Sequence, residues 1–170
     1  MRGHNGMRPQ DVVILLKILT MQDNWQYRDL SNALSISISE ISESLNRSCI
    51  AGLIDEPRRK VFRISLMEFI QYGLHYVFPQ IPGQVVTGTP TAHSHPFYKN
   101  HFASESNYVW PDDQGSMRGM LIEPLHKGVV KAVKEDAQLY KALASIDIIR
   151  VGKSREKKLA IEELKKIILI

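Results

Sequence analysis

The sequence has a single cysteine, Cys49, no hydrophobic run long enough to span a membrane, and no glycine-rich loop with the Gly-Lys-Ser spacing that cradles phosphate. One cysteine excludes an internal disulfide and any zinc site built from several cysteines. The apolar stretch at residues 12–19 is interrupted by Lys17 and lacks the cleavage pattern of a signal peptide. We therefore expect a cytoplasmic protein without a cofactor.

What is present is an ordinary globular composition. The 170 residues are 44% hydrophobic and 24% charged, enough for one large or two small domains. Lysine and arginine number 22 against 18 acidic residues. This basic balance suits a polyanionic partner, although many proteins that bind none share it.

The chain divides by composition into four segments. Residues 1–7 are predicted to be a flexible leader, with Met7 as a candidate natural start, and residues 8–78 a winged helix DNA-binding domain. Residues 79–122 are rich in Pro, Gly, Thr, His and Asn and predict a loop-rich segment with a short hairpin. Residues 123–170 predict a C-terminal helical region suited to dimerisation. The expected fold is mainly α with a small β wing, a winged helix-turn-helix domain plus a helical C-terminal extension.

The first predicted helix, residues 12–19, is apolar nearly all round. Pro9 and Asp11 suit its first turn, because proline lacks an N–H and an acid favours the positive end of the helix dipole. A helix that is apolar on several faces must be covered on more than one side. The sequence therefore implies a second layer of the fold or a second subunit.

Two further helices are predicted to form a helix-turn-helix. Residues 27–34 make the first of them, residues 35–37 make a tight turn, and Ser37 with Glu40 matches the Ser-x-x-Glu capping box that starts the next helix. Gly52 is placed to end that helix in a left-handed conformation. A basic hairpin tip, residues 55–60, lies between two apolar segments that end near Ile64 and predicts the wing.

This arrangement suggests a DNA-binding surface. One helix of such a motif enters the major groove, and a basic hairpin reaches the flanking phosphates. Asn46 could read adenine and Arg47 guanine. Glu40 and Glu43 repel phosphate unless they cap the helix or accept from cytosine, so the wing is expected to supply most of the electrostatic attraction. The candidate DNA-binding residues are Ser37, Ser39, Glu43, Asn46, Arg47, Arg58, Arg59, Lys60 and Arg63. For each of them, a merely solvated surface position is the alternative.

The stretch RDLSNALSISISEISESLNRSCIAGLI, followed by the charged hairpin, resembles the MarR-like winged helix transcriptional regulators. The resemblance covers residues 8–64. It implies a homodimer on a two-fold symmetric operator in double-stranded DNA and, often, control by a small-molecule effector. The segment after Ser65 looks unlike that family, so the resemblance does not extend to a ligand site.

The second half of the sequence contains fewer clear signals of structure. Ser65 and Glu68 form another capping box, which predicts a helix that runs to Phe78. Residues 107–111 and 116–122 predict a short hairpin, and further helices are expected at 124–134, 136–149 and 154–168. The stretches YVFPQIPGQVVTGTPTAH, VWPDDQGSMRG and IDIIRVGKSREKKLA are similar to a group of bacterial winged helix proteins described as regulators. That similarity suggests that Gly83, Gly88, Pro90, Thr91 and the segment at Trp110 belong to one shaped surface.

Three functions are compatible with these patterns. The first is a DNA-binding transcriptional regulator, most simply a repressor, and the second is a winged helix adaptor that binds a protein and shows no sequence preference for DNA. The third is a metal-dependent enzyme that uses His93, His95 and His101, because histidine is a common zinc ligand. Isolated polar-loop histidines are more often solvated. The serines of the predicted recognition helix, Ser37, Ser39, Ser42, Ser44 and Ser48, have neither a nearby base nor an oxyanion turn, so we predict no enzyme and no metal. Cys49 is expected to pack in the core, with redox sensing as the alternative.

Overall fold

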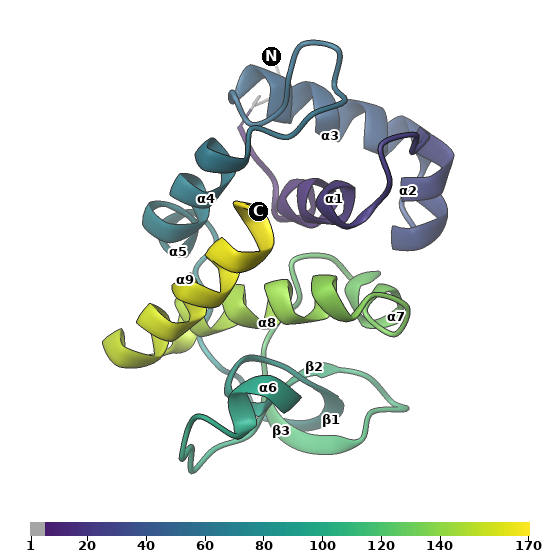
Figure 1. Ribbon diagram of the computed structural model, residues 1–170. Helices are drawn as coiled ribbons and strands as arrows, with labels where there is room; N and C mark the ends of the chain where they lie inside the picture. The colour runs from purple at the N-terminus through teal and green to yellow at the C-terminus, as the bar shows by residue number, and fades with distance from the viewer. Residues whose placement is uncertain (1–5) are drawn as a thin grey trace, which may run out of the picture.

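The computed structural model describes residues 6–170 and is mainly α-helical with a small three-stranded sheet, which confirms the coarse fold class (Figure 1). The helices are α1 (Pro9–Thr20), α2 (Tyr27–Leu34), α3 (Ile38–Ile50), α4 (Arg63–Tyr72), α5 (Leu74–Val77), a 3₁₀ turn (Ala92–Ser94), α6 (Pro96–Lys99), α7 (Val129–Ala132), α8 (Ala137–Val151) and α9 (Ser154–Ile168). From top to bottom in Figure 1, α3 lies over α1, α1 lies over α8, and the sheet lies below α8. No helix among these residues is long and apolar enough to cross a membrane.

Residues 1–5 of the predicted flexible leader lie outside the described residues. Met7, which was predicted to belong to that leader, instead packs against the core, where its sulfur accepts a hydrogen bond from the Ser48 hydroxyl at 3.8 Å. Met7 is therefore part of the folded chain and does not belong to a flexible leader.

Helix α1 is covered on several sides within one chain. Val12, Val13, Ile14 and Leu15 are fully buried, and α2, α3 and α8 all pack against this helix. The sequence implied that either a second layer of the fold or a second subunit covers α1. The structure has the second layer, which α8 supplies. The apolar circumference of α1 thus gives no reason for a dimer, and α1 is withdrawn as a dimer contact.

The segment after α3 differs from the prediction at its end. Gly52 has a φ of +79°, as expected, and the hairpin is held by one bridge between Ile54 and Val61. The predicted second strand through Ile64 is wrong, because α4 already begins at Arg63 with Phe62 as its N-cap. Ser65 therefore lies inside the helix and does not cap it. The earlier start places Leu66 and Ile70 in the core.

The predicted hairpin in the loop-rich segment is also wrong in its pairing. The two expected strands exist as β2 (Tyr108–Pro111) and β3 (Met117–Leu121), but they pair parallel to each other. Both pair antiparallel with an unpredicted strand, β1 (Val85–Pro90), and the three strands close on one another. At Gly88, β1 passes from β3 to β2, and a Cβ there would lie 2.0 Å from the Trp110 carbonyl oxygen. Only glycine fits at this crossing.

A buried polar cluster attaches the sheet to α8. Asp147 accepts hydrogen bonds from the Thr91 hydroxyl and the Trp110 indole, both at 2.7 Å, and from Arg150 at 3.0 Å. Arg150 also donates to the carbonyl oxygens of Phe78 and Glu123. The segments around Thr91 and Trp110 do lie together, but both side chains are buried against α8, so the expectation that they belong to one shaped surface is wrong for these two residues.

The C-terminal helices follow the sequence signals closely, with one exception. Asp136 caps α8 by accepting from the Leu139 N–H at 2.9 Å, and α9 has the predicted bounds. The helix expected over residues 124–134 is reduced to the short α7. The loop before it presses Gly128 against the end of α2, where a Cβ would lie 2.1 Å from the Leu34 carbonyl oxygen.

Candidate nucleic-acid interface

Helix α3 presents a polar face to solvent. Its N-cap is Ser37, whose hydroxyl accepts from the Glu40 N–H at 3.2 Å, as the capping box predicts. The turn before it places Ser35 in the left-handed region, with φ +56°, and buries Ile36. The opposite side of α3 enters the core through Ile41 and Leu45. The side chains that remain exposed on α3 include Ser39, Glu40, Ser42, Glu43 and Asn46.

Arg47 does not belong to this exposed face. Its guanidinium donates two hydrogen bonds to the Asp11 carboxylate, at 2.9 Å from Nε and 2.7 Å from Nη2, and both side chains are buried. Hydrogen bonding to Asp11 raises the pKa of Arg47 further above the physiological range. Removing one member of such a pair leaves an uncompensated buried charge. The prediction that Arg47 reads guanine is therefore corrected, because its donors are directed at α1.

At the hairpin tip, Arg58 is joined to α3. Its backbone φ is +59°, and its Nη2 donates to the Asn46 side-chain oxygen at 2.7 Å. The Arg58 Nε is buried and makes no hydrogen bond. Asn46 and Arg58 thus form one polar unit at the junction of helix and hairpin, and each orients the other.

Arg59 is used differently, because it holds the hairpin to the rest of the fold. Its guanidinium donates to the carbonyl oxygens of Asp23 at 3.2 Å and Trp25 at 2.6 Å, and it lies over the Trp25 ring at 3.8 Å from the ring centroid. A guanidinium stacked on an indole and bonded to two carbonyls has few free donors. Arg59 therefore holds the hairpin in place. The prediction that it contacts DNA is corrected, because its donors are bonded within the fold.

The last two predicted cations, Lys60 and Arg63, differ in what their side chains contact. Lys60 is exposed at the tip, whereas Arg63 donates to the Ile168 carbonyl oxygen at 2.9 Å and so ties the start of α4 to the end of α9. Arg63 is withdrawn as a phosphate contact, since its side chain is directed at the C-terminal helix.

Asp55 shapes the hairpin turn. Its carboxylate accepts from the backbone N–H groups of Arg59 at 2.6 Å and Lys60 at 3.0 Å. Desolvation opposes ionisation of Asp55, but the hydrogen bonds from the Lys60 and Arg59 N–H groups and the charges of these two residues together lower its pKa. The ionised carboxylate therefore holds the tip in one conformation while it leaves the Lys60 side chain in solvent.

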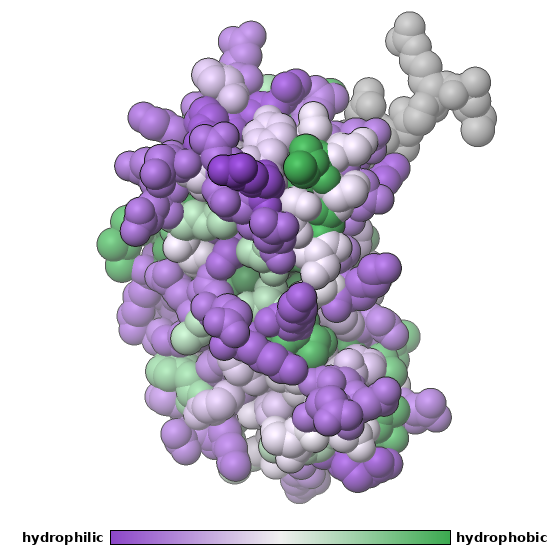
Figure 2. Space-filling view, turned by 90° about the vertical axis from the view of Figure 1, so that its right-hand side faces the viewer, coloured by the Kyte–Doolittle hydropathy of each residue, from purple (hydrophilic) through white to green (hydrophobic). Residues whose placement is uncertain are grey.

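A neighbour that the sequence did not predict lies beside the α2–α3 turn. The loop at residues 126–128 packs against the end of α2. Burial and then the charge of Lys127 lower the pKa of His126, against a smaller opposing effect of the charge of Glu40. Lys127 is exposed there. Figure 2 faces the α2 and α7 side, and much of this face is hydrophilic. About ninety residues separate this loop from the turn, so no local sequence signal could have revealed their contact.

The three histidines proposed for a metal do not converge. His93 pairs with Glu156 at 2.8 Å, the His95 ring accepts from the Phe97 N–H at 3.1 Å, and His101 contacts the Phe97 carbonyl oxygen at 2.8 Å. Within residues 6–170, no group of three or more His, Cys, Asp or Glu side chains could hold a metal ion. Cys49 is partly buried against the core, as predicted.

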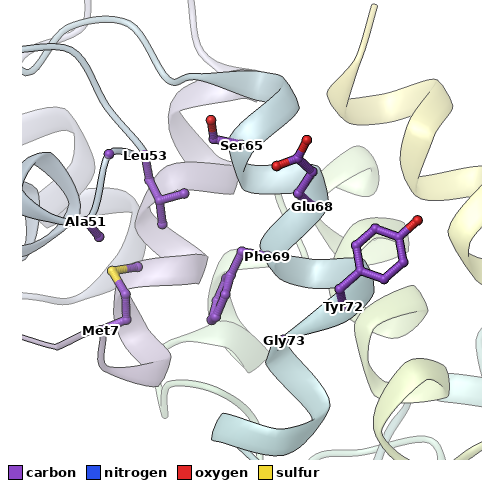
Figure 3. Close-up of a pocket in the computed structure, with 9 residues that line it drawn as sticks. Met7, Ala51, Leu53, Ser65, Glu68, Phe69, Tyr72 and Gly73 are labelled. Carbon is purple, nitrogen blue, oxygen red and sulfur yellow. The ribbon is translucent and has the colours of Figure 1, made fainter.

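An open groove lies between the end of α3 and α4. It has a volume of about 660 Å³. Figure 3 shows Phe69 directed toward Met7 and Leu53, while Tyr72 points to the other side of α4. Glu68 is the one titratable carboxylate among its lining residues. The groove is therefore mainly apolar and adjoins the outer surface of α4.

Comparison of the chain with protein-family models, with curated proteins and with solved structures finds no match.

Proposed function

We propose that this chain is a cytoplasmic DNA-binding transcriptional regulator of the winged helix type, with α3 as its recognition helix and residues 53–62 as its wing. The observation that carries this proposal is the junction at which the exposed polar face of α3 meets the hairpin tip, where Asn46 accepts from Arg58 and Lys60 extends into solvent. A helix that offers amide and hydroxyl groups beside a flanking cation suits a major groove bordered by phosphates.

The proposed roles divide the polar residues into contacts and supports. Ser37, Ser39, Glu43 and Asn46 face the bases or the adjacent backbone, and Arg58 and Lys60 face phosphates. Arg47 and Arg59 support the interface from behind, through Asp11 and Trp25. Asn46 bonded to Arg58 keeps its amide N–H₂ group free to donate, which suits base oxygens or ring nitrogens.

The electrostatics predict modest affinity and shallow salt dependence. Residues 1–78 contain nine Lys and Arg against eight Asp and Glu, so this half of the chain is close to neutral. Two phosphate contacts per chain correspond to a slope of log K against log salt of about −2. Specific base contacts must then contribute a large share of the binding free energy.

The double variant Arg58→Ala with Lys60→Ala tests this proposal. Fragments of upstream DNA selected by the purified wild-type protein would serve as probes in fluorescence anisotropy at several salt concentrations. We expect affinity to fall at least about tenfold at low salt and the salt slope to decrease by about 2, because both phosphate contacts are lost. Arg155→Ala with Lys158→Ala, at two exposed positions on α9, is the matched control and should bind as the wild type does.

Equal losses in the wing and α9 variants would contradict docking through the wing. Wild-type protein that shows no preference among DNA fragments would instead favour the adaptor function.

A further inference from the structure

The outer side of α4 and α5 is apolar and uncovered. Phe62, Ile64, Tyr72, Tyr76 and Val77 are all exposed, and Leu169 from the chain's end lies beside Phe62 and Ile64. These six residues form what we term the α4–α5 strip. Ile64 and Tyr72 are eight residues apart and so project from the same side of α4.

The strip is separate from the core face of the same helices. Leu66, Ile70 and Leu74 are fully buried against the rest of the fold. Ile64, Tyr72 and Tyr76, by contrast, are 70%, 68% and 79% exposed. Internal packing thus explains one side of α4 and α5 and leaves the other without a role in the single chain.

Charge is also scarce here. Between Phe62 and Val77, the residues with a formal charge at neutral pH, when histidine is neutral, are Arg63 and Glu68. Arg63 is bonded to the Ile168 carbonyl oxygen, and Glu68 lies four residues from both Ile64 and Tyr72, on their side of α4. Depletion of charge and enrichment in tyrosine and phenylalanine are typical of the centre of a protein–protein interface.

The exposed area is of the size that a stable interface uses. With about 200 Å² for a fully exposed large residue, the six residues of the strip expose roughly 700 Å². A standard interface buries about 800 Å² on each partner. Polar neighbours such as Gln71 would supply the remainder at the rim.

We propose that the α4–α5 strip is the contact surface for a second copy of this chain. A two-fold interface requires one surface to carry both projections and the hollows that receive them. Tyr72 and Ile64 project from α4, the groove at Phe69 lies on one side of this helix, and a second hollow at Phe62, Ile64 and Leu169 lies at its start.

The position of the strip agrees with the proposed function, on which this part of the inference rests. Figure 1 shows α4 and α5 at the side of the molecule, with α3 and the hairpin at the top. Joining two chains through this side, about an axis that runs from top to bottom, places both α3 helices on the same surface. A dimer so arranged suits an operator with two half-sites.

Sedimentation velocity across about 1–100 µM protein tests the surface. We expect a wild-type dimer and, for Tyr72→Glu with Tyr76→Glu, a monomer with at least a 100-fold weaker dimerisation constant. Tyr72→Phe with Tyr76→Phe keeps the apolar area and should remain dimeric. Gln138→Glu with Gln114→Glu, at two exposed positions outside the strip, controls for the two added charges. Circular dichroism melting would establish that the double glutamate variant is folded.

Three outcomes would overturn the proposal: a wild-type monomer at all concentrations, a dimer that persists in the folded glutamate variant, or a monomer that floats with lipid vesicles through Tyr72 and Tyr76. The last would assign the strip to a membrane surface. A dimer lost in the glutamate variant, together with no DNA preference in the wild type, would uphold this interface and count against the proposed function alone.

Discussion

His95 illustrates how a residue with suitable chemistry for a metal site is used for packing instead. Its ring accepts from the Phe97 N–H and so caps α6, and it lies 4.3 Å from the Tyr140 ring, centroid to centroid. Burial, together with the nearby charge of Lys141, lowers the pKa of His95 to about 4. The side chain is therefore neutral in the folded protein at pH 7, and protonation would remove its acceptor.

This shift predicts a pH dependence of stability. The pKa of His95 is lower in the folded state than the unfolded value near 6.5, so the unfolded chain binds the proton more readily between pH 6.5 and 4. The contribution of His95 to stability is complete above about pH 6.5 and is lost as pH falls. Between pH 7 and pH 5 we expect a loss of about 2 kcal/mol from this group.

Urea unfolding of His95→Asn at the two pH values measures the effect. Asparagine preserves a capping acceptor but does not titrate, so this variant should lose about 2 kcal/mol less than wild type between pH 7 and pH 5. His101→Asn, at an exposed position, should retain the wild-type dependence. Identical pH dependence in the His95 variant and wild type would contradict the assignment.

At the scale of elements, the hairpin is the part of the proposed interface that depends most on contacts with the rest of the fold. A single bridge, Ile54 to Val61, joins its two sides, and isolated two-stranded hairpins are marginal in water. Its position depends on Asp55 at the tip and on Arg59 packed against Trp25. The cations of the tip thus serve two purposes, which the sequence alone could not separate.

Arg59→Ala should destabilise the protein by about 1–3 kcal/mol, because a charged hydrogen bond and a cation–π contact are lost. Lys60→Ala should change stability by less than about 0.5 kcal/mol, since its side chain is exposed. Thermal or urea unfolding of the two single variants makes this comparison. Equal stability of Arg59→Ala and wild type would show that Arg59 is free and would return it to the DNA contact set.

At the scale of the molecule, the two halves share one core. Buried residues from α1 to α9 form a continuous hydrophobic cluster, α8 packs on α1, and Lys17 pairs with Asp136 at 2.8 Å. The predicted segments 8–78, 79–122 and 123–170 therefore all contribute residues to one hydrophobic core. Helix α3, which carries the proposed interface, packs on α1, and α1 packs on α8. The order of α3 therefore depends on the second half through α1.

A cavity far from α3 should consequently weaken the whole fold. Leu164 on α9 is fully buried, and Leu164→Ala should cost about 2–5 kcal/mol. In native-state hydrogen exchange, the slowest amides of α1 should lose protection by the same free energy, as expected for one cooperative unit. Ile170→Ala, at an exposed site, is the control. Unchanged protection in α1 would show that the first half unfolds independently.

Local signals in the sequence were enough for several elements. The Ser37 cap, the left-handed Gly52, the Asp136 cap and the bounds of α9 follow from backbone hydrogen bonding and helical periodicity, which act over a few residues. The proposed recognition helix was located by the same signals. Its exposed polar residues Ser39, Glu43 and Asn46 could likewise be chosen from periodicity.

Only the tertiary structure decided which charged groups are free and which strands pair. Arg47, Arg59 and Arg63 look like surface cations in the sequence, yet each is directed at a partner at least thirty residues away. Strand β1 pairs with β2 and β3, which lie farther along a loop-rich segment, and the apolar helix α1 is covered by α8. These outcomes depend on which distant groups the closed chain brings together, whereas caps and periodicities depend on neighbours that are fixed by the covalent chain itself.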